Sequence, residues 1–106
     1  MDNPISHPAP LADLVAYQPG SVVSRVLLKN GGGVMTVFAF AEGEGLTEHT
    51  SPHEAVVQIL EGEARITIED AVHEVAAGEV LHLPATIPHA LHSEGGFKML
   101  LTLLKN

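Results

Sequence analysis

Glycine and proline divide the chain, from residue 20 onwards, into apolar runs that are too short for ordinary helices. These runs are rich in Val, Leu, Ile and Phe, which favour β-strands, and residues 64–69 alternate cleanly between apolar and polar side chains. Turn-forming residues separate each run from the next. The expected strands are residues 21–28, 34–41, 55–60, 64–69, 72–75, 80–83, 88–92 and 97–104. No long amphipathic helix fits between these breaks, so the pattern predicts an all-β sandwich or barrel.

The first 20 residues differ in character from the rest of the chain. Pro4, Pro8 and Pro10 restrict the backbone to extended conformations, so residues 1–20 are predicted to form a Pro-rich N-terminal arm. Within this arm, residues 11–17 are expected to form one short helical or strand-like turn. Residues 21–106 are predicted to form a single β-barrel domain, whose first hairpin turns at the sequence Asn-Gly-Gly-Gly.

Composition restricts the classes of partner. The chain has 106 residues, which fits one domain, and its formal net charge of −8 argues against binding to nucleic acid or to an anionic membrane surface. The absence of Cys excludes disulfides and zinc–thiolate sites. The N-terminus lacks the basic and apolar regions of a signal peptide, and no apolar run approaches the length of a membrane span. We therefore expect a cytoplasmic protein.

Two blocks of sequence carry histidines in a recurring arrangement. The first, residues 45–62, reads GLTEHTSPHEAVVQILEG, and the second, residues 78–89, reads GEVLHLPATIPH. Their order and separation resemble the two signatures of the cupin superfamily, in which H-x-H precedes a Glu and P-x-G precedes a further His. The chain is therefore identified as similar to a small single-domain cupin. The resemblance implies a double-stranded β-helix, or jelly-roll barrel, that covers nearly the whole chain after residue 20.

Cupins typically hold a divalent metal inside the barrel with three His and one Glu or Gln. Two of these four positions match in this chain, at His49 and His89. The second His of the first signature is replaced by Ser51, and the Glu or Gln by Ala55, which has no metal-binding group. The Gly of P-x-G is replaced by Thr86, a change expected to affect only the chemistry of the turn.

A third histidine is a candidate for completing the metal site. Three protein ligands are the usual minimum for catalytic zinc or non-haem iron. His53 lies two residues before Ala55, so in an extended strand its side chain points to the same face. We therefore predict a displaced metal site formed by His49, His53 and His89, with solvent completing the shell and Fe, Mn, Ni or Zn as the metal. The alternative places His53 in water, with the other two histidines hydrogen-bonded inside an empty pocket.

Other polar residues near these histidines have weaker claims to the site. Glu48 and Glu54 can act as a fourth ligand or as acceptors for an imidazole N–H, although a solvated surface charge is the favoured interpretation for both. His82 could face the pocket, although a position outside it is the favoured interpretation. Strict alternation places His92 on the face opposite to the pocket. Ser51 could act as a nucleophile with a neighbouring histidine as base, but no third residue that would orient the histidine is evident, so nucleophilic catalysis is poorly supported.

The inward faces of the strands are expected to form a pocket beside the histidines. The candidate lining residues are Met35, Val37, Val57, Ile59, Leu91 and Met99. A small apolar or carboxylate-bearing molecule could enter such a pocket as ligand or substrate. Three functions are open at this point: a metal-dependent oxygenase or isomerase, a non-catalytic small-molecule-binding or sensing cupin with a degenerate metal site, and a structural protein without a pocket function.

A homodimer is the expected assembly. Short barrels benefit from covering their edge strands, and the resemblance to small cupins implies paired or exchanged edges. The expected contact surfaces are the Pro-rich arm and the apolar strand over residues 97–104.

Overall fold

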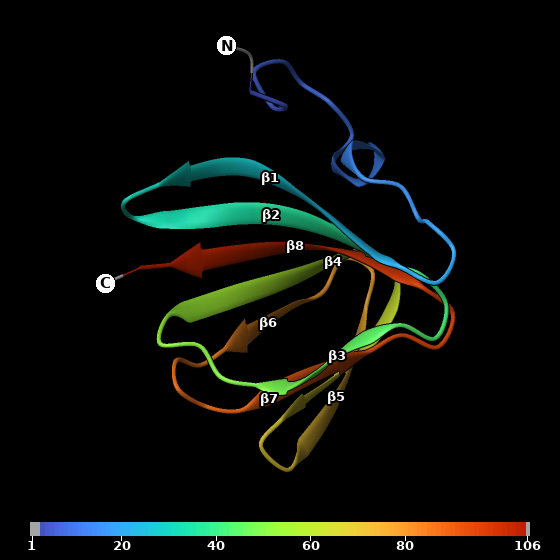
Figure 1. Cartoon of the computed structure of the whole chain (residues 1–106), viewed down its shortest axis with the longest axis vertical. Helices are drawn as coiled ribbons and strands as arrows, with labels where there is room; N and C mark the ends of the chain where they lie inside the picture. Colours follow the sequence, from blue (N-terminus) through green and yellow to red (C-terminus); the bar gives the residue numbers. More distant parts are fainter. Residues whose placement is uncertain (1–2, 106) are drawn as a thin grey trace.

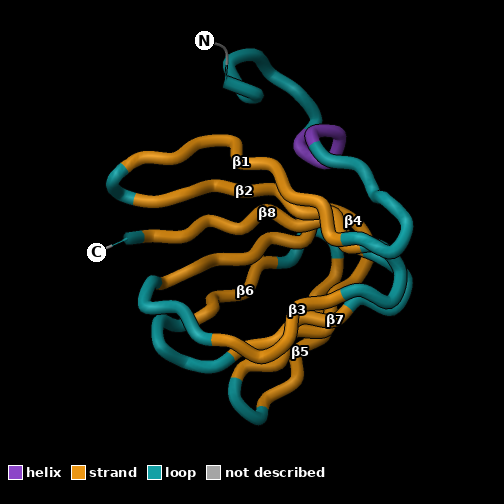
Figure 2. The backbone as a smooth tube through the Cα atoms, viewed as in Figure 1, coloured by secondary structure: helices purple, strands orange, loops and turns teal. Residues whose placement is uncertain are grey.

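The computed structural model describes residues 3–105, and this part of the chain folds into eight β-strands and one 3-10 helix (Figure 1). The elements are η1 (Leu11–Leu14), β1 (Val22–Asn30), β2 (Gly33–Phe40), β3 (Gly45–His49), β4 (Glu54–Ile68), β5 (Ala71–Ala76), β6 (Val80–Leu83), β7 (His89–His92) and β8 (Phe97–Leu104). Strands dominate the backbone in Figure 2, so the all-β prediction is confirmed. Among the described residues, no helix is long and apolar enough to cross a membrane.

Every strand pairing is antiparallel, and the sheet curls on itself. The strand order is β1-β2-β8-β4-β7-β3, and β5 and β6 also pair with β4. The first half of β4 pairs with β8 and β6, whereas its second half pairs with β7 and β5. The strand β4 therefore passes from one layer of the barrel to the other, and the two layers enclose the core between them (Figure 1).

The continuity of β4 corrects a sequence prediction. The sequence pattern predicted a turn at Gly62 between two separate strands, but β4 runs from Glu54 to Ile68 without a break. Gly62 has a φ of 78°, and a Cβ at this position would lie 2.3 Å from the carbonyl oxygen of Gly96. The glycine lets β4 change direction while it stays hydrogen-bonded to its neighbours, because a residue without a side chain tolerates both the positive φ and the close approach.

The main core lies between the two layers. Phe40 and Phe97 stack at its centre with ring centroids 4.5 Å apart, and Val57, Ile59 and Ile66 are fully buried around them. These residues come from β2, β8 and both halves of β4, and Leu83 of β6 and Leu91 of β7 belong to the same cluster, so the core ties together the strands that carry the two histidine blocks.

A second apolar cluster lies between the N-terminal arm and the outer face of the sheet. Val15 of the arm is buried with Leu27, Val37 and Leu100, and Met35 packs against this cluster. Both faces of β2 are therefore covered. The prediction that Met35 and Val37 line the pocket is therefore wrong. The alternation along β2 was predicted correctly, but because both faces are apolar it did not show which set of side chains points inward, and Met35 and Val37 point to the outer face.

The buried side chain of Lys98 fastens the arm to the barrel. Its Nζ donates a hydrogen bond to the carbonyl oxygen of Ala12 at 2.7 Å and lies 5.1 Å from the ring centroid of Tyr17. The carboxylate of Glu61 is 3.9 Å from the same Nζ. Burial, together with this carboxylate, raises the pKa of Tyr17 above its usual value. Residues 11–15 of the arm, drawn in blue in Figure 1, therefore pack against the barrel, whereas residues 5–10 are exposed.

Candidate functional site

A cavity of about 90 Å³ lies between the barrel layers at the end where β3 finishes and β7 begins. Its walls are contributed by β2, β3, β4, β6, β7 and β8 and by the loop before β4. The lining residues are Phe38, Leu46, His49, Ser51, Ala55, Leu83, His89, Leu91, Met99, Leu101 and Leu103. Apart from two imidazoles and one hydroxyl, the lining is apolar. Leu91 and Met99 were predicted to line this pocket, and both do so, whereas Val57 and Ile59, predicted with them, are buried in the main core instead.

The two histidines of the cavity face each other across a strand pair. His49 ends β3 and His89 begins β7, and the two residues are register partners in the antiparallel β3–β7 pair. Their rings meet edge to face, with centroids 4.4 Å apart. His89 is buried and His49 is exposed, so the pair extends from the interior to the mouth of the cavity. The structure thus brings together the two positions that match the cupin signatures.

Backbone carbonyls fix the orientation and the tautomer of both rings. Nδ1–H of His49 donates to the carbonyl oxygen of Thr47 at 2.8 Å, and Nδ1–H of His89 donates to that of Ile87 at 3.2 Å. A carbonyl oxygen can only accept, so the proton of each neutral ring is on Nδ1 and the lone pair is on Nε2. Neither Nε2 has a hydrogen-bond partner within residues 3–105. The pair therefore offers two acceptor nitrogens.

Burial keeps His89 neutral. Desolvation is the main cause that lowers the pKa of His89 from 6.5, and the nearby His49 also lowers it, whereas the hydrogen bond to Ile87 acts in the opposite direction. In a buried imidazole without a carboxylate partner, desolvation destabilises the charged form by more than the hydrogen bond to the backbone carbonyl stabilises it. At neutral pH, His89 is therefore an uncharged hydrogen-bond acceptor.

Ser51 and Ala55 occupy the cavity wall at the two substituted signature positions. The Oγ of Ser51 accepts a hydrogen bond from the backbone N–H of His53 at 3.2 Å, and its hydroxyl proton is free to donate. Ala55 is buried and contributes only a methyl group. Where the family pattern has two ligand side chains, this wall has one hydroxyl and one apolar contact.

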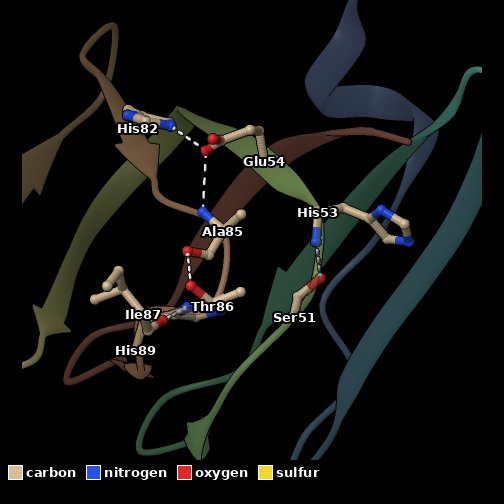
Figure 3. Close-up of polar contacts among 8 residues, drawn as sticks. All are labelled: Ser51, His53, Glu54, His82, Ala85, Thr86, Ile87 and His89. Atoms are coloured by element: carbon tan, nitrogen blue, oxygen red, sulfur yellow. Dashed lines mark hydrogen bonds and ion pairs between the residues drawn. The ribbon is translucent and has the colours of Figure 1, made fainter. Parts of the chain in front are cut away.

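His53 does not join the other two predicted ligands. Figure 3 shows its ring turned away from Ser51 and from the segment that carries His89, and His53 does not line the cavity. Its Nδ1 is buried without a hydrogen-bond partner among the described residues. The expected alternation fails because β4 begins only at Glu54, and residue 53 belongs to the bend that precedes it.

Glu54 and His82 form a clamp outside the cavity. The Oε1 of Glu54 accepts hydrogen bonds from Nε2 of His82 at 2.7 Å and from the backbone N–H of Ala85 at 3.0 Å (Figure 3). The hydrogen bond from His82, followed by that from Ala85, lowers the pKa of Glu54. His82 is exposed, so it serves the loop after β6 and not the pocket. Glu48 is exposed as well, in line with the surface charge favoured above.

A second contact joins the same loop to the mouth of the cavity. The backbone N–H of Thr86 donates to the carbonyl oxygen of Ser51 at 2.7 Å, which links the segment before β4 to the segment before β7. Thr86 has a φ of 66°, a conformation that is costly for a β-branched residue. Sequence reasoning treated the replacement of Gly by Thr86 as minor, but it places strain beside the site.

The donor set does not fit the metal site that the family resemblance implied. Two imidazoles are one short of the three protein ligands that catalytic zinc and non-haem iron sites use. Within residues 3–105, no group of three or more His, Cys, Asp or Glu side chains is arranged to hold a metal ion. His49 and His89 could supply two nitrogens, but Ser51 and the apolar walls add no carboxylate or imidazole.

A larger cleft of about 600 Å³ lies away from these histidines. It is lined by Gly62, Glu63, Arg65, Glu74, His92, Glu94, Gly95 and Gly96. Arg65 is already paired with Glu74 at 2.8 Å and with Glu94 at 3.4 Å. His92 is exposed on this side, as alternation predicted. We place the candidate site in the smaller cavity because polar groups converge there on an apolar pocket.

Comparison with known families identifies this architecture. A sequence model described as the cupin domain matches residues 36–104, which include both histidine blocks. The chain is a member of the cupin family. The match covers the strands that build the cavity, so the resemblance carried by the two signatures is confirmed. The comparison with curated proteins found no significant match.

Solved cupin structures agree over nearly the full chain. A conserved protein of unknown function from Streptococcus pyogenes is 36% identical, with a TM-score of 0.90 over 95% of this chain and 89% of that one. A cupin superfamily protein from Desulfitobacterium hafniense is 34% identical, with a TM-score of 0.90 over 95% and 93%. A cupin 2 conserved barrel domain protein from Leptotrichia buccalis is 43% identical, with a TM-score of 0.86 over 90% of this chain and 46% of that longer one.

Sequence reasoning missed two groups of residues at the site. The unpredicted apolar lining residues are Phe38 of β2, Leu46 of β3, Leu83 of β6 and Leu101 and Leu103 of β8. The signal for Phe38 was its alternation with Phe40. Glu54 was proposed as an acceptor for an imidazole N–H, but its two partners, His82 and Ala85, were not predicted because they lie 28 and 31 residues further along the chain.

Proposed function

We propose that this cupin binds a small molecule in the cavity beside His49 and His89, and that it does so without a three-ligand metal centre. One observation carries the proposal: two imidazoles, each fixed by a backbone carbonyl, converge on a pocket whose other walls are almost entirely apolar. Apolar pockets with a few convergent polar groups are the usual form of a small-molecule site. This is the binding or sensing alternative of the sequence analysis.

The proposal accounts for the two substituted signature positions. Ala55 keeps the wall apolar, and Ser51 leaves one hydroxyl group where a third nitrogen ligand would stand. Both changes favour contact with an organic molecule over coordination of an ion, because a metal requires several charged or strongly basic donors. The contacts of Glu54 and Thr86 hold the loops at the mouth in place, so the pocket is formed before a ligand enters.

A thermal-shift screen of small alcohols, acids and sugars tests this function. A specific ligand at about 100 times its Kd adds about 2.7 kcal/mol of stability to the folded state. We expect the shift to be lost in His49→Ala and in His89→Gln. It should persist in His92→Ala, because His92 is an exposed histidine outside the cavity. Equal shifts in all three variants would show that binding occurs elsewhere.

A metal-dependent oxygenase or isomerase is the second candidate, and one observation favours it. Histidines that bind metals usually donate their other ring N–H to a backbone carbonyl or carboxylate, as His49 and His89 do. Metal analysis of untagged protein, purified without chelators, distinguishes the candidates. A stoichiometric divalent metal that disappears in His49→Ala would favour the enzyme. A metal content far below one equivalent would favour the metal-free pocket.

A further inference from the structure

We infer from the polar groups of the cavity that its ligand is a small, mainly apolar molecule with a hydroxyl head group, and that carboxylates are disfavoured. This inference rests on the proposed function and specifies its ligand class. It starts from the hydrogen-bonding capacity of the wall. Of the eleven lining residues, only His49, Ser51 and His89 have polar side chains.

The two imidazoles present acceptors to the ligand. Each Nδ1–H is already used by a backbone carbonyl, so Nε2 of each neutral ring offers a lone pair. A ligand must therefore donate a hydrogen bond to be held by either ring. The oxygen of a ketone or of a carboxylate has no proton to give, and its lone pairs would oppose those of Nε2.

Ser51 supplies the complementary donor. Its Oγ accepts from the N–H of His53, which leaves the hydroxyl proton available to the ligand. A ligand hydroxyl can donate to one imidazole and accept from Ser51 at the same time. An alcohol thus satisfies Ser51 and the buried His89 with one head group, while the exposed His49 can accept from water; a group that only accepts leaves His89 without a partner.

Within the described part of the chain, the pocket offers no positively charged side chain to balance the charge of a bound carboxylate. Among residues 3–105, no Lys or Arg lines the cavity, and the only titratable group that faces His89 there is the ring of His49 at a centroid distance of 4.4 Å. The surrounding β2, β4, β6 and β8 contribute only apolar side chains. The lining thus provides no Lys or Arg side chain to receive an anion, and burying an unpaired carboxylate against apolar walls is costly.

The size of the cavity limits the apolar part of the ligand. A dry cavity of about 150 Å³ accommodates benzene. The present cavity, of about 90 Å³, is smaller. It therefore suits a short branched or linear chain of about four or five non-hydrogen atoms. The apolar part would lie against Phe38, Leu91 and Met99, with the hydroxyl directed to the imidazoles.

Three probes of similar size test the inference: 2-butanol, 2-butanone and butyrate. Binding is followed by NMR titration at neutral pH, with the ¹⁵N shifts of the histidine side chains as the readout. We expect 2-butanol to bind about fivefold or more tightly than 2-butanone, as for the loss of one hydrogen bond, and to move the Nε2 signal of His89. His89→Phe should abolish the preference, while the exposed-site control His92→Phe should retain it.

The outcomes separate the inference from the function on which it rests. If 2-butanone or butyrate binds as tightly as 2-butanol, the ligand class is overturned while a small-molecule pocket still stands. If none of the three probes binds, both the ligand class and the proposed function are overturned. Circular dichroism of both phenylalanine variants establishes that each is folded, so that a lost preference in His89→Phe reports on the pocket.

Discussion

At the scale of single residues, the site combines groups that are individually unfavourable in a barrel. His89 is a titratable side chain that is only 6% exposed, and Thr86 is a β-branched residue at positive φ. Both lie in the second histidine block, within four positions of each other. Such concentrations of unfavourable groups occur where the surrounding structure is shaped for binding. Each of the two residues leads to a prediction about stability.

The buried imidazole of His89 should make stability depend on pH. The folded state holds the pKa of His89 below the reference value of 6.5, so below that pH the unfolded chain binds a proton that the folded chain does not. Stability is therefore complete above 6.5 and is lost as the pH falls, by at most about 1.4 kcal/mol per pH unit. Urea denaturation at about pH 7.5 and pH 5.5 should show a smaller loss in His89→Gln than in the wild type. An equal loss would refute the assignment, and His92→Gln serves as an exposed control.

The strained backbone of Thr86 should be relieved by glycine. A left-handed conformation costs a residue with a Cβ about 1–2 kcal/mol, part of which is offset by the greater chain entropy of Gly in the unfolded state. We expect Thr86→Gly to raise the free energy of unfolding by about 0.5–1 kcal/mol, measured by urea denaturation. Thr86→Ala should give no gain, because it keeps the unfavourable φ of 66°. A stabilised alanine variant would show that the strain lies in the side chain instead.

At the scale of elements, β4 is the strand that connects the layers, and Gly62 is where it turns. A Cβ at Gly62 would approach the carbonyl of Gly96 to 2.3 Å at a φ of 78°. Gly78 has a φ of 88° and nothing within 4 Å of such a Cβ, so it isolates the cost of the dihedral angle. We expect Gly78→Ala to cost about 1–2 kcal/mol and Gly62→Ala at least about 2 kcal/mol more, by urea denaturation. Equal costs for the two variants would mean that the backbone at the start of β8 moves away from the added methyl group without a measurable loss of stability.

Strand existence was predictable from the sequence, but strand continuity and direction were not. The runs at residues 80–83 and 97–104 have the observed bounds of β6 and β8: Gly78 and Pro84 flank the first run, and Gly96 precedes the second. Three features escaped: β3 is polar and mostly exposed, Gly62 bends a strand instead of ending one, and β4 starts one residue after His53. Each depends on tertiary contacts that no local pattern contains.

The same limit applies to the candidate site. The pairing of His49 with His89 could be predicted because both positions match family signatures, and the β3–β7 register then brings the rings together. The position of His53 could not, because periodicity applies only within a strand and residue 53 precedes β4. Which side chains of β2 point inward could not be predicted either, because the arm buries the outer face of the strand as fully as the core buries the inner one.

At the scale of the whole molecule, the homodimer predicted from the sequence has a different expected contact. The strand β8 lies between β2 and β4, so it has no free edge to offer. In the described part of the chain, β1 pairs only with β2 and exposes Val26 and Leu28. An unpaired edge strand with exposed apolar side chains is a natural template for pairing with a second copy. We therefore propose β1 as the dimer contact.

Sedimentation velocity at several concentrations measures this contact. We expect the wild type to sediment as a dimer and Val26→Lys to sediment as a monomer, because a charge on an edge strand opposes pairing. Val72→Lys is the matched control: Val72 is equally apolar and exposed at 59%, compared with 51% for Val26, but it lies on β5 at the other layer. A dimer that survives Val26→Lys but dissociates in Val72→Lys would place the contact on β5. A wild type that remains monomeric at every concentration would refute the homodimer.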